Sequence, residues 1–162
     1  MNPKKVSLDA KPVAGISVCT TNIQESDPDM AEIPSLWDRF YNRGLTRRVV
    51  DQQKPHTVFG VYSSYESDAD GAYKVTAGLD VKKHGPALIG LETIEIEPGE
   101  YLVFEGRGRM PSAIYETWGR IWDYFGCNGR VNDSSGLQRA YKTDFEEYRG
   151  DDQIAIYIGI KS

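Results

Sequence analysis

An acidic pair flanked by aromatic residues, near the end of the chain, is the feature best suited to chemistry. Residues Phe145 to Tyr148 have the sequence Phe-Glu-Glu-Tyr. A carboxylate among aromatic rings can bind a cation, because its own charge and the electron-rich ring faces both attract positive charge. A simple register for a closing hairpin puts Glu146 opposite Ala155 and diagonal to Tyr157, as the floor of a pocket. The simpler alternative is a strand glutamate exposed to solvent.

The hairpin that would position this glutamate contains the most regular strand in the chain. Isoleucine recurs at every second position from Ile154 to Ile160, which is typical of a strand with one apolar face. Residues 149–152 predict a tight turn, because Gly150 can adopt a positive φ. Residues 144–148 should therefore run antiparallel to the isoleucine strand.

The rest of the chain alternates between strand and helix patterns. An amphipathic pattern predicts helices over 33–42 and from Pro111 to Phe125, and residues 22–31 predict a polar loop. Apolar β-forming residues predict further strands over 11–20, 57–63, 72–81, 91–97 and 100–107. The second and third of these should pair as a hairpin, and the last two should form another hairpin around Pro98-Gly99.

An internal repeat relates the two halves of the chain. Trp37 and its neighbours match Trp118 and its neighbours, and residues 77–80 match residues 158–161, in both cases at an offset of 81. We therefore expect an α+β fold with two βαββ units, about 11–83 and 100–161, joined by a connecting strand at about 91–97. Paired around a pseudo-twofold axis, they would give a curved antiparallel sheet, two main helices and a central groove. Residues 1–162 would form one domain.

Composition and charge limit the classes of function. The net charge is −5, and no basic run is longer than a pair such as Arg47-Arg48, so a nucleic-acid partner is not expected. The sequence has no apolar run near the roughly 20 residues of a membrane helix and no secretory signal pattern, so a membrane location is not expected either. Cys19 and Cys127 have neither metal-ligand spacing nor the number needed for a disulfide framework, which predicts a cytoplasmic protein.

Catalytic and cofactor motifs are absent from the sequence. His56 and His84 stand in polar segments without a partner at ligand spacing. The sequence shows no Ser-His-Asp order, zinc motif or phosphate loop. We therefore expect no metal site, no cofactor and no residue assigned to catalysis.

Several of these features together resemble a known family. The two βαββ units, the helix at 33–41, the segment 94–104, the Phe-Glu-x-Tyr motif at 145–148 and the strand at 154–160 resemble the gyrase-inhibitor-like domain. The same domain serves as the AraC-type effector-binding module. Within this family, the chain is most similar to stand-alone integron cassette proteins.

The resemblance implies an aromatic pocket for lipophilic cations, such as cationic drugs. It assigns the cation-binding carboxylate to Glu146 and an aromatic neighbour to Tyr157. Relatives that regulate transcription carry a separate helix-turn-helix domain, which this chain has no room for. A regulatory role would therefore need a separate DNA-binding partner protein.

Four further aromatic residues are candidates for ligand contact. Trp118 and Trp122 would lie beside the pseudo-twofold axis, which favours the pocket. Trp37 could instead pack against the sheet as core, and Tyr62 could be a surface tyrosine at the end of its strand. Tryptophan and tyrosine suit such a pocket because each combines an apolar ring with a polar edge.

Three functions remain open at this stage. The first is a binding module for a lipophilic or aromatic cation. The second is a hydrolase in which Glu146 activates water and Trp118 or Tyr157 holds the substrate, as the resemblance allows. The third is a protein inhibitor of a larger enzyme, which an exposed acidic patch would support. The glutamates between Glu92 and Glu105 are better explained as a charged edge that resists strand pairing.

Overall fold

The protein is an α+β domain with one antiparallel sheet and helices on one of its faces, as the sequence predicted. The computed structural model describes residues 3–44, 57–67, 71–81, 91–125, 137–150 and 152–161. In chain order, its helices and strands are β1 (Lys4–Leu8), β2 (Lys11–Thr20), α1 (Asn22–Glu25), α2 (Ile33–Asn42), β3 (Thr57–Ser63), β4 (Tyr73–Asp80), β5 (Glu92–Ile96), β6 (Gly99–Arg107), α4 (Ser112–Phe125), β7 (Gln138–Arg149) and β8 (Gln153–Lys161).

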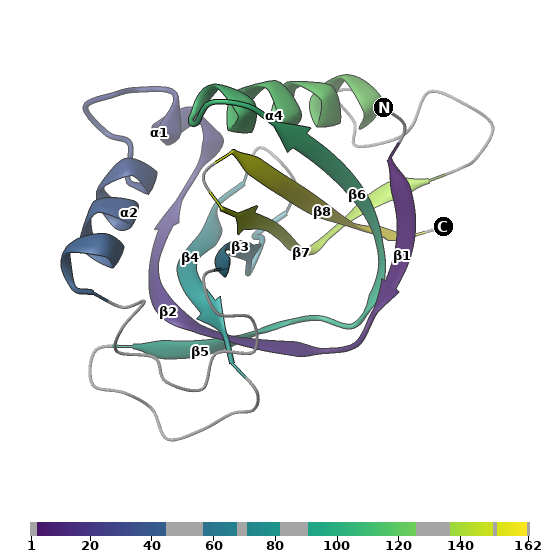
Figure 1. Ribbon diagram of the computed structural model, residues 1–162, viewed down its shortest axis with the longest axis horizontal. Helices are drawn as coiled ribbons and strands as arrows, with labels where there is room; N and C mark the ends of the chain where they lie inside the picture. The colour runs from purple at the N-terminus through teal and green to yellow at the C-terminus, as the bar shows by residue number, and fades with distance from the viewer. Residues whose placement is uncertain are drawn as a thin grey trace.

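The order of the strands has the symmetry expected of two related units. The eight strands lie in the order β1-β6-β8-β7-β3-β4-β2-β5, and β3 pairs with β7 at the centre. Helix α2 packs on β2 and β4, and α4 packs on β6 and β8. Figure 1 shows the sheet curving strongly, with α4 across one half and α2 beside the other. The curved antiparallel sheet with two main helices is confirmed.

Side chains on the two faces of the sheet enter two separate apolar layers. Phe40 of α2 and Phe125 of α4 are buried against the helix-covered face. Phe59 and Phe145 belong to a separate cluster on the opposite face, which the curvature of the sheet encloses. Because successive strand residues point to opposite faces, the register of each strand decides which layer a side chain enters.

The predicted register of the closing hairpin is wrong by one residue. Glu146 lies opposite Ile156, and Glu147 is the residue that faces Ala155. Strand β7 ends at Arg149 and β8 begins at Gln153, so three residues separate the strands instead of two. Gly150 has the expected positive φ of 77°. The extra residue in the turn shifts the pairing, since loop length sets hairpin register.

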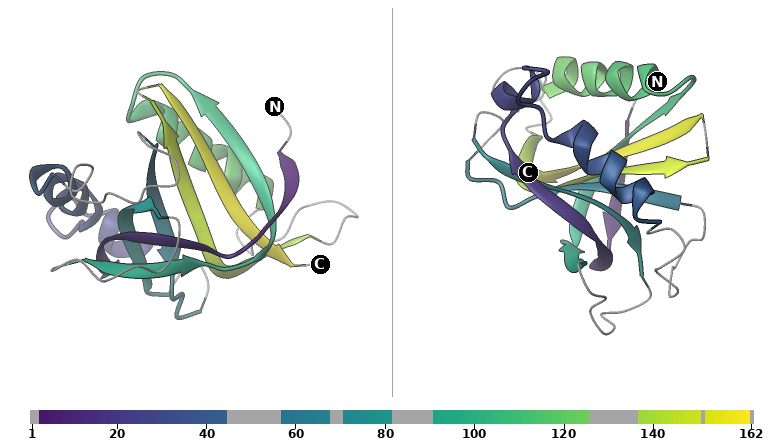
Figure 2. Two further views of the ribbon diagram at one scale, coloured as in Figure 1. Left: turned by 60° about the horizontal axis from the view of Figure 1, so that its bottom comes forward. Right: turned by 90° about the vertical axis from the view of Figure 1, so that its left-hand side faces the viewer.

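The predicted hairpin around Pro98-Gly99 is also wrong. Strand β5 pairs with β2, whereas β6 pairs with β1 and β8. Figure 2 shows the chain running on from β5 into β6, from one half of the sheet to the other. The glutamates between Glu92 and Glu105 therefore do not lie on one hairpin. Glu92 forms an ion pair with Lys74 at 3.0 Å.

Two short elements were not predicted. Residues Lys4–Leu8 form β1, an edge strand that pairs with β6. Helix α1 lies within the segment expected to be a polar loop, and the Thr21 side chain accepts a hydrogen bond from the backbone of Gln24 at its start. The hairpin of β3 and β4 forms as predicted.

The remaining sequence predictions concern membrane helices, cysteines, histidines, the basic pair and the internal repeat. None of the described helices combines the length and the apolar character needed to cross a lipid bilayer. Cys19 is an exposed free thiol. Cys127, His56, His84 and Arg47-Arg48 lie outside the described residues. The superposition of residues 11–83 on 100–161 stays a prediction.

Candidate ligand-binding site

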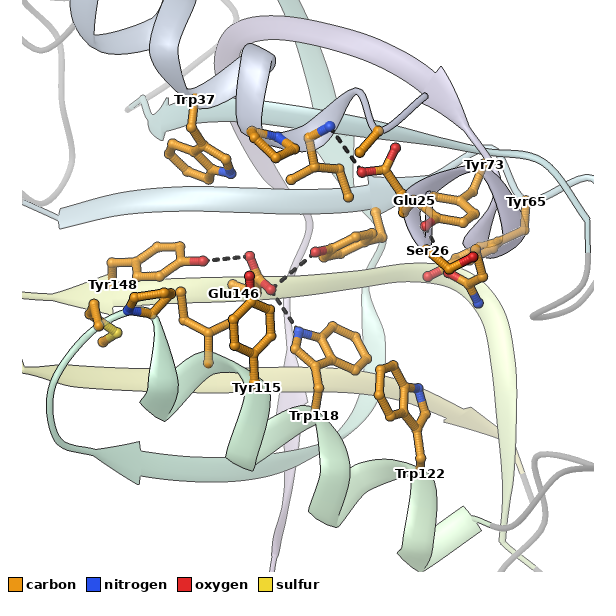
Figure 3. A pocket seen from close by; sticks show the side chains of 18 of the residues that line it. Glu25, Ser26, Trp37, Tyr65, Tyr73, Tyr115, Trp118, Trp122, Glu146 and Tyr148 are labelled. Atoms are coloured by element: carbon orange, nitrogen blue, oxygen red, sulfur yellow. Dashed lines mark hydrogen bonds between the residues drawn. The ribbon is translucent and has the colours of Figure 1, made fainter. Parts of the chain in front are cut away.

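A large aromatic cavity lies between the helices and the central strands of the sheet. Its volume is about 860 Å³, within the range of about 300 to 1,000 Å³ typical of small-molecule sites. Figure 3 shows α2 on one side of the cavity, α4 on the other and β7 between them. Nine aromatic side chains line it: Trp37, Tyr41, Tyr62, Tyr65, Tyr73, Tyr115, Trp118, Trp122 and Tyr148.

Glu146 lies at the centre of this cavity and accepts three hydrogen bonds. The indole Nε1 of Trp118 donates to Oε2 at 2.7 Å, and the Tyr62 hydroxyl donates to the same oxygen at 3.0 Å. The Tyr148 hydroxyl donates to Oε1 at 2.7 Å. These donors come from α4, β3 and β7, so three separate elements hold one carboxylate in place (Figure 3).

The three hydrogen-bond donors to Glu146 are all neutral, and Glu146 as a residue is 3% exposed. Burial raises the pKa of Glu146, because desolvation disfavours its charge, and the three hydrogen bonds lower the pKa in part. Burial also raises the pKa values of Tyr62 and Tyr148, and the nearby Glu146 adds to that shift. The tyrosines therefore stay protonated at neutral pH and continue to donate. The result is a buried acid without a cation among the described residues that contact it.

A glycine makes room for the carboxylate. Gly60 of β3 pairs with Glu146 across the centre of the sheet. A Cβ atom on Gly60 would lie 2.7 Å from Glu146 Oε1 and 3.1 Å from Trp37 Cζ2. Any larger residue would therefore push the carboxylate away from its hydrogen-bond donors.

Gly60→Ala is expected to weaken binding of an aromatic cation by roughly tenfold and to destabilise the protein by about 1 to 2 kcal/mol, the usual scale of overpacking. Isothermal titration calorimetry and urea unfolding measure the two effects. Gly119→Ala on α4 is the matched control, because a Cβ there meets nothing within 4 Å. Equal binding by the two variants would show that the position of the carboxylate does not matter.

Five of the six aromatic and acidic residues expected at the site line the cavity. Trp37, Tyr62, Trp118 and Trp122 all line the cavity together with Glu146. Trp37 lies across the cavity from Trp118, its counterpart in the repeat (Figure 3). Trp122 is 55% exposed at the mouth.

Tyr157 is the exception. It pairs with Phe145 in the register and stacks on the Phe145 ring with centroids 4.3 Å apart, on the sheet face opposite Glu146. Its hydroxyl accepts a hydrogen bond from Arg149. The expected contact between Tyr157 and Glu146 is therefore wrong, and the one-residue register shift is the reason.

Tyr148 takes the place that was expected for Tyr157. The signal was present in the Phe-Glu-x-Tyr motif, because residues i and i+2 of a strand point to the same face. Tyr41, Tyr65, Tyr73 and Tyr115 were also not predicted, since they approach the cavity from α2, α4, the first residue of β4 and the segment before β4. No local pattern indicates that these segments meet.

A second acid at the cavity has a structural role. The carboxylate of Glu25 accepts hydrogen bonds from the backbone N–H groups of Glu32 and Ile33 and from the Thr20 hydroxyl. It thereby supplies the acceptors that the first turn of α2 needs, because Glu32 makes no side-chain cap. Glu25 therefore fixes the helix that carries Trp37.

One end of the cavity contains a buried ion pair. Arg139 Nη2 donates to Asp144 Oδ2 at 2.7 Å, and the Tyr65 hydroxyl donates to the same oxygen. The backbone N–H of Gly159 donates to Asp144 Oδ1 at 2.8 Å. Arg139 and Tyr65 both line the cavity. Across the described ranges, no three His, Cys, Asp or Glu side chains gather as metal ligands.

Comparisons with known proteins place this architecture in a family. The family model of integron-associated effector binding proteins, Cass2, matches residues 6–160. YobU of Bacillus subtilis (strain 168), named as a candidate transcriptional regulator, is 30% identical over 162 residues, which cover 95% of this chain and 94% of YobU.

Solved structures agree with the family model. The integron cassette protein VCH_CASS2, from the mobile metagenome of Vibrio cholerae, matches with a TM-score of 0.83 and 30% identity over 99% of this chain and 97% of that chain. SAV2435, solved with bound tetraphenylphosphonium, shares the fold with a TM-score of 0.76 and 16% identity over 100% of this chain and 95% of that chain. The resemblance found in the sequence is confirmed, and the chain belongs to the Cass2 family of integron-associated effector binding proteins.

Proposed function

We propose that this protein binds lipophilic or aromatic cations in the cavity between α2 and α4, with Glu146 as the counter-charge. One observation carries the proposal: Glu146 is buried among aromatic rings, and the donors that contact it from the described part of the chain are all neutral. A cation would remove part of the desolvation cost of the carboxylate, and each ring face in contact adds about 0.5 to 2 kcal/mol. Membership of an effector-binding family and the tetraphenylphosphonium in SAV2435 support this choice of ligand class.

The geometry favours cations without N–H donors. A carboxylate offers about four lone-pair positions, and three hydrogen bonds already occupy both oxygens of Glu146. A primary ammonium would lose its water shell and find too few acceptors in exchange. A phosphonium or a delocalised aromatic cation loses little on desolvation, so charge and ring contact alone suffice for it.

The same hydrogen bonds weigh against the hydrolase alternative. A general base needs an oxygen that can accept a proton from water. Trp118 and Tyr62 share one oxygen of Glu146, and Tyr148 takes the other. The arrangement suits a fixed counter-charge better than a base.

If the binding signal reaches DNA, we propose that a separate DNA-binding protein carries it, since the described elements all belong to the sheet or its helices.

The contribution of Glu146 to the stability of the empty protein should fall as pH rises above its unfolded pKa of about 4.3. The pKa of Glu146 is raised in the folded state relative to an unfolded value of about 4.3. The contribution of this group is therefore fully present below the unfolded pKa and is lost as pH rises through the folded pKa. Urea unfolding of wild type and Glu146→Gln at pH 4 and pH 8 measures the loss, and the difference between the two proteins isolates Glu146.

Cation binding should show the opposite dependence on pH. Ionised Glu146 pairs with the cation, so affinity increases as pH rises through the raised pKa of the empty site. The surrounding tyrosines do not contribute, because burial raises the pKa values of Tyr62 and Tyr148 above 10 and that of Tyr73 to about 12. A pH-independent affinity in wild type would contradict the role of Glu146.

A further inference from the structure

The buried ion pair at the end of the cavity leaves the Arg139 guanidinium with unused donors. Arg139 is 7% exposed. Among the described residues, Nη2 is its one nitrogen with a hydrogen-bond acceptor, Asp144, and Nε is buried without a partner. Asp144, in contrast, also accepts from Tyr65 and from the Gly159 backbone. The carboxylate is well satisfied, whereas the guanidinium has N–H groups to spare.

A continuous wall of rings connects this end of the cavity with Glu146. Trp118, which contacts Glu146, lies 5.5 Å from Tyr62 between ring centroids, and Tyr62 lies 5.9 Å from Tyr73. Tyr73 in turn lies 5.9 Å from Tyr65, whose hydroxyl contacts Asp144. Glu146, Arg139 and all four rings line the same cavity. The site therefore has an acidic centre, an aromatic wall and a terminal cationic donor.

We infer that the preferred ligands are elongated and dipolar: a cationic group at Glu146, an apolar body along the tyrosine wall and a hydrogen-bond acceptor, such as a carboxylate or carbonyl oxygen, that reaches Arg139. Nε is too buried to meet a ligand, but Arg139 lines the cavity, and among the described residues Nη1 has no hydrogen-bond acceptor. An acceptor on the ligand can pair with Nη1, and a guanidinium suits a carboxylate because its N–H groups form a planar fork. This inference rests on the proposed function and adds a second point of recognition to it.

Matched phosphonium probes test the inference at pH 8. Each pair consists of an alkyltriphenylphosphonium and the same cation with a terminal carboxylate on the alkyl chain, with a butyl or a decyl linker. Calorimetry with the wild-type protein should give about tenfold tighter binding for the carboxylate probe of one linker length, the scale of one hydrogen bond to a charged group. In Arg139→Lys, which keeps the charge but removes the fork, the carboxylate probe and the alkyl probe of that linker length should bind with equal affinity.

The outcomes separate the inference from the proposed function. If the alkyl probes do not bind, the proposed function fails. If they bind and neither carboxylate improves affinity in wild type, only the role of Arg139 fails, and no variant is needed for that conclusion. If the carboxylate probe still binds more tightly than the alkyl probe in Arg139→Lys, the role of Arg139 is also overturned. A crystal structure of the wild-type complex gives a reading independent of the folding of the variant: the carboxylate lies against Arg139, or the inference is wrong.

Discussion

Glu146→Gln is expected to weaken binding of tetraphenylphosphonium by about 10- to 100-fold at pH 8, the scale of losing one charged partner of about 1 to 3 kcal/mol. Glutamine fits the site without new strain. The Trp118 indole can only donate, so the amide oxygen must face Trp118 and Tyr62. The amide nitrogen then faces Tyr148, whose hydroxyl can rotate to accept. The variant removes the charge and keeps the shape.

Glu147→Gln is the matched control for this substitution. Glu147 is one residue away and equally buried, at 2% exposed, but it points to the opposite face of the sheet, where it pairs with Arg149. Its loss should lower stability and leave tetraphenylphosphonium affinity within about threefold of wild type, as expected for a substitution that touches no ligand. Equal losses of affinity in the two variants would mean that the effect of Glu146→Gln is general destabilisation.

Trp118→Ala is expected to weaken binding of the same cation by about 30-fold or more. The change removes a ring face, worth about 0.5 to 2 kcal/mol, and a 2.7 Å hydrogen bond to Glu146. With one donor fewer, the pKa of Glu146 rises further, so less of the carboxylate is ionised in the empty site. Trp118→Phe separates the two causes, because it keeps a ring and loses only the N–H.

Trp122→Ala is the control for ring loss at the mouth of the cavity. Trp122 is 55% exposed, and its ring lies 5.9 Å from Trp118 without a contact to Glu146. Affinity in this variant should fall by no more than about fivefold, since exposed cation–π contacts are the weakest. Calorimetry measures all three variants without relying on tryptophan fluorescence. A larger loss for Trp122→Ala than for Trp118→Ala would contradict the central position of Glu146.

The strongest sequence patterns predicted the parts of the fold that depend on local periodicity. The isoleucines of β8 are buried on one face, from Ile154 to Ile158, and the tryptophans related by the 81-residue offset meet in one cavity. Glu146 was predicted at the site because the Phe-Glu-x-Tyr motif marks it whatever the exact register. These predictions do not depend on the exact length of a turn, so an error of one residue in a turn leaves them unchanged.

The errors arose where structure depends on partners distant in the sequence. One additional residue in the turn after Arg149 moved Tyr157 to the opposite face and left Tyr148 beside Glu146. The segment around Pro98 and Gly99 has the composition of a turn, yet β5 and β6 find partners in different halves of the sheet. Strand β1 lies at the edge of the sheet, where its two lysines are exposed. Its sequence therefore lacks the apolar pattern that predicts a strand. Loop length and long-range pairing are not recorded in local periodicity.

Calorimetric titration of the wild-type protein with tetraphenylphosphonium and with tetraphenylborate at pH 8 tests the central claim most directly. The two ions have nearly the same size and the same phenyl surface but opposite charge. A site built on ionised Glu146 should bind the phosphonium at least about 100-fold more tightly, because the borate would place a like charge against a buried carboxylate. Equal affinities, or tighter binding of tetraphenylborate, would show that the cavity recognises apolar surface alone and that Glu146 is not its counter-charge.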